Sequence, residues 1–139
     1  MIKTDLMLKN VVEYPGWNKD GTSGFFMVRD LFWEDDKIAL TDGVIQLPCC
    51  RLEYIKPVPI SKEWLMKFGF TVSPAANSTY ISIPKLKGEI HFEDFRGGLV
   101  CILYCSTGSF IPENIEYVHQ LQNLFHSLTH EELTVPQLR

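Results

Sequence analysis

The sequence contains no long apolar run, no cluster of basic residues and no cysteine pair with metal-binding spacing. A membrane-spanning helix needs about 18 consecutive apolar residues, and no stretch of the chain approaches that length. Residues 1–10 do not show the charged and then apolar pattern of a secretory signal peptide. We therefore expect a cytoplasmic protein that does not enter a membrane.

Positive charge is scarce. The chain has 13 lysines and arginines against 17 acidic residues, and its net charge is −4. Proteins that bind the phosphate backbone usually present a basic stripe, because neutralised phosphates supply most of the affinity. Here Lys85 and Lys87 form the densest basic pair. Nucleic-acid binding is therefore disfavoured and stands third among the functions considered.

Four cysteines are present, and they do not form a recognisable redox or zinc motif. Neither the pair Cys49 and Cys50 nor the pair Cys101 and Cys105 has the two-residue spacing of such motifs. Thiols stay reduced in the cytosol, and free cysteines usually pack inside proteins as small hydrophobic residues. The sequence therefore predicts free thiols and indicates no cofactor.

Residues 1–58 read as short apolar strands separated by turn residues. Val11 and Val12 favour a first strand within residues 5–13, and Tyr14-Pro15-Gly16 is a turn. Further strands are predicted at residues 25–33, 37–40, 44–47 and 51–55. Several short strands at this spacing are typical of a small antiparallel barrel or a curled sheet, and an SH3-like barrel fits the length. We therefore predict a β-rich, SH3-like barrel subdomain over residues 1–58.

Residues 59–139 read as helix, three strands and helix. Ser61 is a predicted N-cap of a short helix that ends near Gly69. Strands are predicted at 79–83, 89–95 and 99–105, and a longer amphipathic helix is predicted over about 113–128. Thr129 and Glu132 would then form a capping box, with a short helical turn or a bend after Leu128. The fold class is thus α+β, with an SH3-like subdomain packed on a C-terminal α-β-β-β-α subdomain.

Two segments of the second half resemble one group of proteins. Residues 55–70 read IKPVPISKEWLMKFGF, and residues 117–125 read YVHQLQNLF, followed by Leu128, Thr129 and residues 131–134. These segments resemble a junction and a C-terminal helix in small uncharacterised proteins of gut Bacteroides-type bacteria and their prophages. The resemblance implies a prophage or mobile-element origin. It implies no activity and transfers no site residues.

Histidines near the C-terminus are candidates for a metal or hydrolytic site. His126 and His130 are four residues apart, which would place them on one face of a continuous helix. A zinc site needs further ligands, so surface histidines are the favoured interpretation. A cysteine nucleophile would need a nearby histidine, and Cys105 with His91 is the pair left open. The alternative function is a small hydrolase or metal-dependent enzyme that uses His119, His126 or Cys105.

Aromatic residues are dense in the first half, and three of them stand beside turns or acidic residues: Trp17, Phe32 and Trp33. Aromatics beside acidic loops can line a peptide groove in an SH3-like barrel, and exposed aromatics form interface hot spots. The other interpretation is that they fill a small core. The leading function is a non-enzymatic interaction module that binds a protein partner or itself, with these three residues as candidate binding residues.

Overall fold

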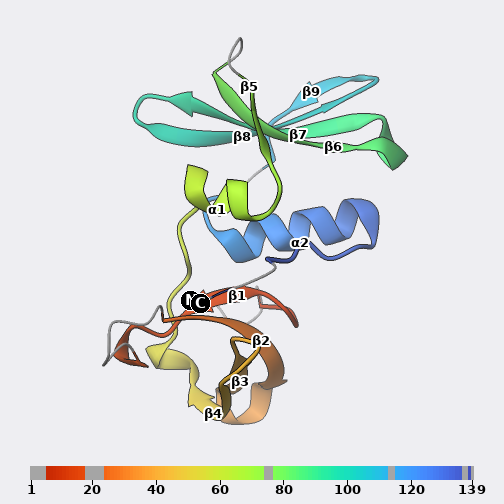
Figure 1. The fold of residues 1–139 in the computed structure, drawn as a ribbon. Helices are drawn as coiled ribbons and strands as arrows, with labels where there is room; N and C mark the ends of the chain where they lie inside the picture. Colours follow the sequence, from red (N-terminus) through yellow and green to blue (C-terminus); the bar gives the residue numbers. More distant parts are fainter. Residues whose placement is uncertain (1–5, 18–23, 74–76, 113–114, 136–137, 139) are drawn as a thin grey trace.

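The elements lie in three layers, as Figure 1 shows: a five-stranded sheet, two α-helices, and a four-stranded sheet. This computed structural model describes residues 6–17, 24–73, 77–112, 115–135 and 138. All strand pairs in both sheets are antiparallel and follow sequence order. The predicted α+β class is confirmed.

The four-stranded sheet comes from the first half of the chain. Its strands are β1 (Val11–Glu13), β2 (Phe25–Phe32), β3 (Lys37–Thr41) and β4 (Gln46–Arg51), with short 3₁₀ turns η2 (Pro15–Trp17) and η3 (Trp33–Asp35) between them. Register shifts interrupt the pairing of β2 with β3 and of β3 with β4. Such irregularities increase the bend and twist of a sheet. The bent sheet encloses a core that includes Val12, Phe26, Ile38 and Leu40.

This sheet is not the closed barrel that the sequence predicted. Within the described residues, β1 and β4 form the two ends of the sheet and do not pair with each other. Residues 52–54, predicted as strand, form the 3₁₀ turn η4 (Leu52–Tyr54). The chain then returns to β1, where the backbones of Glu13 and Lys56 exchange hydrogen bonds of 3.0 and 2.9 Å. The likeness to an SH3 barrel stays a prediction.

Helix α1 (Lys62–Lys67) begins and ends where the sequence predicted. The Trp64 amide donates a 3.3 Å hydrogen bond to the Ser61 hydroxyl, which caps the first turn. Gly69 lies in the left-handed region with φ +92°, a conformation in which glycine has no Cβ penalty. The predicted boundary after residue 58 falls in the extended connector before this helix and stays a prediction.

The second sheet has five strands rather than the three that were predicted. They are β5 (Thr71–Ser73), β6 (Ser78–Ile83), β7 (Gly88–Phe95), β8 (Gly98–Cys105) and β9 (Gly108–Phe110), with the 3₁₀ turn η5 (Pro84–Leu86) between β6 and β7. The three central strands match the predicted ones closely. The two added strands are three-residue edge strands, which are too short to show a periodic pattern in the sequence.

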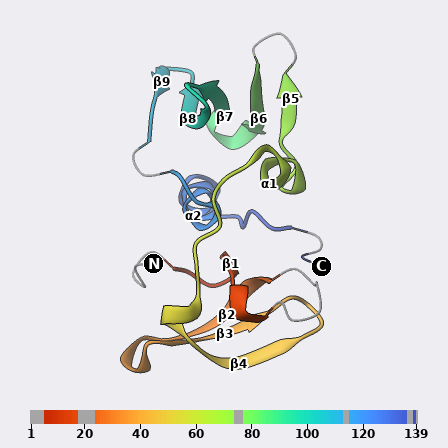
Figure 2. The same ribbon diagram turned by 90° about the vertical axis from the view of Figure 1, so that its left-hand side faces the viewer.

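Helix α2 (Val118–Thr129) lies between the two sheets, as the end-on view in Figure 2 shows. Leu121 and Val118 are fully buried in a core shared with Leu65 of α1 and with the inner face of the five-stranded sheet. Strand β1 reaches both cores because its side chains alternate: Val11 packs on the helix layer and Val12 on the bent sheet. Within the described residues, neither helix has the length and apolar character needed to span a membrane.

A buried glutamine on α2 joins the layers. The Gln122 side-chain oxygen accepts a 2.7 Å hydrogen bond from the Val11 amide. Its nitrogen donates 3.0 Å bonds to the carbonyl oxygens of Lys9 and Leu133. The neighbouring Asn123 accepts a 2.9 Å bond from Asn10. The Gln122 side chain thus satisfies the Val11 amide on the edge of β1 whose next outward amide, that of Glu13, bonds to Lys56.

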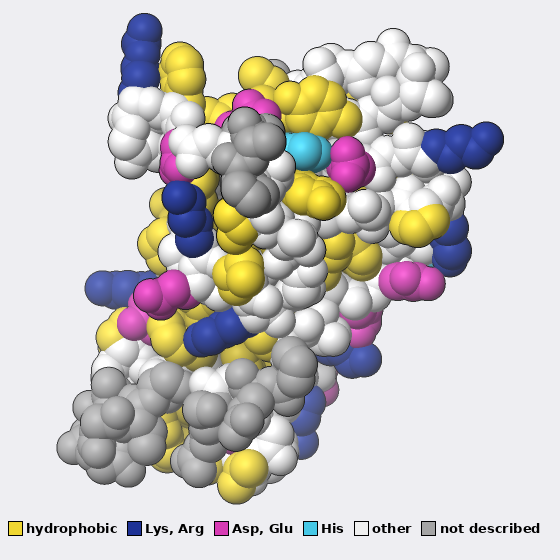
Figure 3. Space-filling model, turned by 45° about the horizontal axis from the view of Figure 1, so that its top comes forward, with side chains coloured by type: hydrophobic (Ala, Val, Ile, Leu, Met, Phe, Trp, Pro, Cys, Tyr) yellow, Lys and Arg dark blue, Asp and Glu magenta, His cyan; other side chains and the backbone are white. Residues whose placement is uncertain are grey.

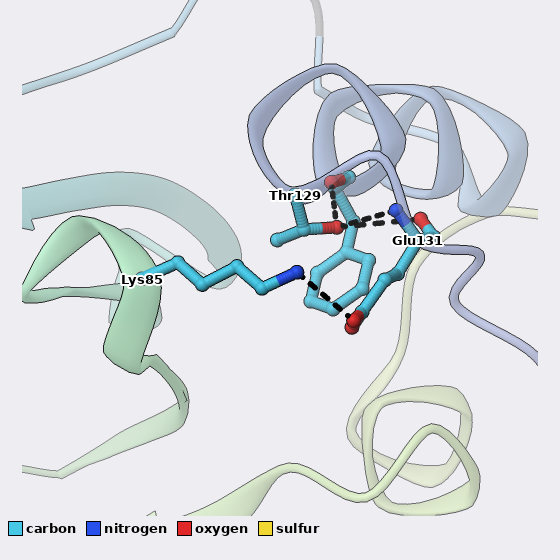
Figure 4. A network of polar contacts seen from close by, with 4 residues as sticks. Lys85, Thr129 and Glu131 are labelled. Atoms are coloured by element: carbon cyan, nitrogen blue, oxygen red, sulfur yellow. Dashed lines mark hydrogen bonds and ion pairs between the residues drawn. The ribbon is translucent and has the colours of Figure 1, made fainter.

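The C-terminal end of α2 differs from the predicted capping box. The Thr129 hydroxyl donates to the Phe125 carbonyl at 2.8 Å and accepts from the Glu131 amide at 3.0 Å. The predicted capping box required a bond from the Glu132 amide instead. Figure 4 shows this network and the 3.2 Å ion pair between Lys85 and Glu131, which ties η5 to the helix end. Thr129 therefore ends the helix instead of starting another turn.

Candidate functional site

The two faces of the five-stranded sheet differ sharply in character. Alternation along β6, β7 and β8 sends Ile90, Phe92, Cys101 and Leu103 inward, where they are buried against the helices. The residues between them point away from the molecule. We call these outward positions the outer face; they are Ser78, Tyr80, Ser82, Glu89, His91, Glu93, Phe95, Val100, Ile102 and Tyr104.

Three aromatic rings form a row across the centre of the outer face. Tyr80 pairs directly with His91 across β6 and β7, and their rings stack at 5.1 Å with an interplanar angle of 17°. Tyr104 on β8 meets the His91 ring edge-on at 4.7 Å. Stacked and edge-to-face arrangements are the favourable geometries for such rings. The row is therefore a platform fixed by cross-strand contacts.

Polar contacts hold the platform in place. Ser78 Oγ lies 3.2 Å from His91 Nδ1, and Glu89 Oε1 lies 3.4 Å from His91 Nε2. The Tyr104 hydroxyl donates a 3.3 Å hydrogen bond to Glu93. Burial raises the pKa of Tyr104, and the charge of Glu93 and this hydrogen bond raise it further. Each ring nitrogen and the phenol therefore have a partner on a neighbouring position.

The outer face carries carboxylates but no lysine or arginine. Its ionisable side chains include two carboxylates, Glu89 and Glu93, and its ten positions include no lysine or arginine. The nearest basic residues along β7 are at its two ends, Lys87 before the strand and Arg96 after it, and Arg96 lies 5.2 Å from the Phe95 ring. Figure 3 shows hydrophobic, histidine and acidic side chains gathered on this side of the molecule, with basic side chains further out.

The serine, histidine and glutamate of this network follow the order of a hydrolytic triad, but the geometry does not suit catalysis. Ser78 is only 2% exposed, so its hydroxyl is covered rather than presented to a substrate. It also lies on a strand that is paired on both sides, where backbone amides are used by the sheet. An acyl-transfer site needs free donors aimed at the developing oxyanion. The contacts instead order the His91 ring.

The aromatic residues singled out in the sequence lie elsewhere, on the four-stranded sheet. Trp17 is half-buried and packs edge-on against Phe26 at 6.1 Å, in the core of that sheet. Phe32 is 39% exposed at the end of β2. The Trp33 side chain lies outside the described part of the structure. No ring contact joins Trp17 to Phe32, and their role in binding stays a prediction.

The three C-terminal histidines occupy three different settings. His119 is 2% exposed in the helix layer, with its ring stacked 6.0 Å from that of Tyr117. His126 is half-buried and lines a pocket of about 180 Å³ beside Lys9. His130 follows the end of α2 with a left-handed φ of 59°, so it does not share a continuous helix face with His126. Within the described residues, no three His, Cys, Asp or Glu side chains are grouped to hold a metal ion.

Cys105 lies apart from His91. Cys105 follows Cys101 and Leu103 in the alternation of β8, so it belongs to the opposite face from His91. Its thiol lies 3.2 Å from the Thr107 hydroxyl. Hydrogen bonds to Thr107, and then to Gly108, lower the pKa of Cys105. The pairing of Cys105 with His91 that the sequence left open is therefore not formed.

Sequence reasoning missed the outer face as a site. Strands were predicted at 79–83, 89–95 and 99–105, but their outward residues were not predicted to form a site. The available signal was one aromatic or histidine at an outward position on each of three consecutive strands. Comparisons with protein-family models, with curated proteins and with solved structures found no match for this chain.

Proposed function

We propose that this protein is a non-enzymatic protein-binding module, and that the outer face of its five-stranded sheet receives a cationic segment of a partner protein. The supporting observation is the platform of Tyr80, His91 and Tyr104 flanked by Glu89 and Glu93, with no lysine or arginine among the outward positions. The Glu89 side chain is 41% exposed, so its charge is accessible to a partner.

A platform of this kind favours cations for two physical reasons. Aromatic faces carry a negative quadrupole that attracts ammonium and guanidinium groups. Carboxylates accept charge-assisted hydrogen bonds, and an arginine can engage them with two donors at once. Aromatic residues also dominate the energy of protein interfaces, because they bury a large area with little loss of side-chain freedom. The aromatic and acidic side chains of the outer face are therefore suited to bind a partner segment in which an arginine or lysine stands beside an apolar residue.

The same charges argue against two other occupants. Two copies of the chain meeting through this face would bring Glu89 and Glu93 against like charges, which costs several kcal/mol at an interface. Nucleic acid would place its phosphates beside the same carboxylates. Proteins bind nucleic acid by neutralising these phosphates with basic side chains, so negative charges on the outer face oppose such binding. A basic protein segment is thus the favoured partner over a second copy or a nucleic acid.

Two broader features of the proposal have their own support. The four cysteines are free thiols, which fits a module that acts in the cytoplasm. The likeness of residues 55–70 and 117–125 to proteins of Bacteroides-type bacteria and their prophages supports a mobile-element origin.

A titration followed by NMR tests the proposal. The ¹⁵N-labelled protein is titrated with blocked peptides that contain two arginines and one tyrosine, and with counterparts in which glutamate replaces arginine. We expect the arginine peptides to shift backbone amides of β6, β7 and β8 in a saturable manner, and the glutamate peptides to leave them unchanged. Saturable shifts confined to other elements, or equal shifts with both peptide sets, would contradict the proposal.

A matched pair of variants separates the outer face from general electrostatics. Glu89→Gln with Glu93→Gln removes two negative charges from the outer face. The control variant, Glu34→Gln with Glu63→Gln, removes two negative charges from exposed positions on η3 and α1. Both variants have a net charge of −2 instead of −4. Only the first is expected to weaken arginine-peptide binding; equal weakening in both would show that the outer face is not the site.

A further inference from the structure

The two carboxylates of the outer face have a fixed separation. Glu89 and Glu93 lie on the same face of one strand, four residues apart. A strand rises about 3.3 Å per residue, so their Cα atoms are about 13 Å apart. His91 lies midway between them, and the rings of Tyr80 and Tyr104 stand on either side of it. Along β7 the outer face therefore presents an acidic, an aromatic and an acidic position in turn.

Both carboxylates keep acceptor capacity for a partner. Glu89 contacts His91 at 3.4 Å and the Ser82 hydroxyl at 3.5 Å, both of them long contacts. Glu93 accepts one hydrogen bond, from Tyr104. A carboxylate has about four lone-pair sites, so an arginine or lysine can add to the bonds already made.

We propose that the partner segment is extended, runs along β7, and carries basic side chains at positions i and i+4 with an apolar or aromatic side chain at i+2. This inference rests on the proposed function. An extended chain has the same rise as β7 and also presents alternate side chains on one face, so positions i, i+2 and i+4 meet Glu89, His91 and Glu93 together. On an α-helix the same span requires eight or nine residues, because the rise is about 1.5 Å.

The ends of β7 limit the length of this motif. Lys87 precedes the strand, so a third basic residue beyond the Glu89 end of the partner motif meets a like charge. Beyond Glu93 the next outward residue is Phe95, and Arg96 already lies 5.2 Å from the centre of its ring. Like charges placed opposite each other at an interface oppose binding. The favoured segment therefore has one basic pair flanked by neutral or acidic residues, rather than a long polybasic run.

The test uses blocked peptides of identical composition and different order. The matched peptide is Arg-Ser-Tyr-Ser-Arg, and the scrambled peptide is Arg-Arg-Tyr-Ser-Ser. Because a second exposed ion pair adds little energy, the matched peptide is expected to bind the native protein about three- to fivefold more tightly. With Glu93→Gln this preference disappears, because only one carboxylate remains; with Glu34→Gln it persists.

Each outcome of this test has a definite meaning. If both peptides shift the outer face with equal affinity, the extended register is wrong while the proposed binding surface stands. If a helical peptide with arginines eight residues apart binds more tightly than the matched peptide, an extended partner is wrong. If no arginine peptide shifts the outer face, both this inference and the proposed function are wrong.

Discussion

Replacing Gln122 with methionine tests how the three layers are held together. Methionine has a similar length and can fill the same space, so the main change is the loss of the amide. The variant loses the bonds to Val11, Lys9 and Leu133. The Val11 amide and the Leu133 carbonyl are then buried without these partners.

The size of the effect follows from those two buried groups. A buried donor or acceptor left without a partner costs about 1–3 kcal/mol, so we expect Gln122→Met to lower the free energy of unfolding by about 2–6 kcal/mol. For a chain of this length each kcal/mol shifts the melting temperature by about 4 °C. The expected decrease is therefore roughly 8–24 °C, a large part of the stability of an ordinary domain.

Urea denaturation and thermal melting by circular dichroism measure this change. The matched control is Gln46→Met, at an exposed position on β4 where the side chain makes a 2.8 Å hydrogen bond to Thr41. The control is expected to stay within about 0.5 kcal/mol of the native protein. A Gln122→Met variant as stable as this control would refute the view that the amide is a major link between α2 and the N-terminal sheet.

Three further predictions concern thiols, a glycine and a helix cap. Burial raises the pKa of Cys101 to about 12 from 9.0, so we expect a thiol reagent at pH 8 to label it only after unfolding. Between pH 9 and about pH 12 the Cys101 thiol is protonated in the folded chain and ionised in the unfolded chain. The free energy of unfolding is therefore expected to fall as the pH rises through this window. Cys105, whose pKa is lowered, is expected to label in the native state at pH 7 and much faster than Cys101, as mass spectrometry of the labelled chain would show. Gly88→Ala places a Cβ 2.5 Å from the Tyr104 carbonyl oxygen, and urea melts should show a loss of about 1–3 kcal/mol as β7 and β8 separate locally. Ser61→Ala removes the N-cap bond of α1 and should lower stability by about 1 kcal/mol in the same assay.

Local sequence signals were sufficient for elements that are defined by their own residues. The alternation of residues 89–95 predicted β7, and the continuous apolar run of residues 99–105 predicted β8. The hydroxyl of Ser61, three residues before Trp64, predicted the start of α1. The face of α2 followed from its three- and four-residue apolar spacing. These signals depend on periodicity and on cap chemistry, which can be read from neighbouring residues.

Features that depend on distant residues were not predictable in this way. Strands β5 and β9 have three residues each and form only because β6 and β8 offer edges to them. The aromatic platform depends on the register that places Tyr80 opposite His91, and register is set by pairing rather than by local pattern. Thr129 bonds to the Phe125 carbonyl and the Glu131 amide instead of forming the capping box expected with Glu132, because α2 ends there.

Reversing the charge of the outer face tests the central claim most directly. Glu89→Lys with Glu93→Lys is compared with Glu34→Lys with Glu63→Lys, which changes the net charge by the same amount at exposed positions elsewhere. Affinities for Arg-Ser-Tyr-Ser-Arg and Glu-Ser-Tyr-Ser-Glu are measured by NMR titration at one fixed salt concentration, since exposed charges are screened by salt. The outer face is predicted to switch its preference from the arginine peptide to the glutamate peptide only in the first variant. An unchanged preference in that variant, or the same switch in both, would contradict a cation-binding outer face.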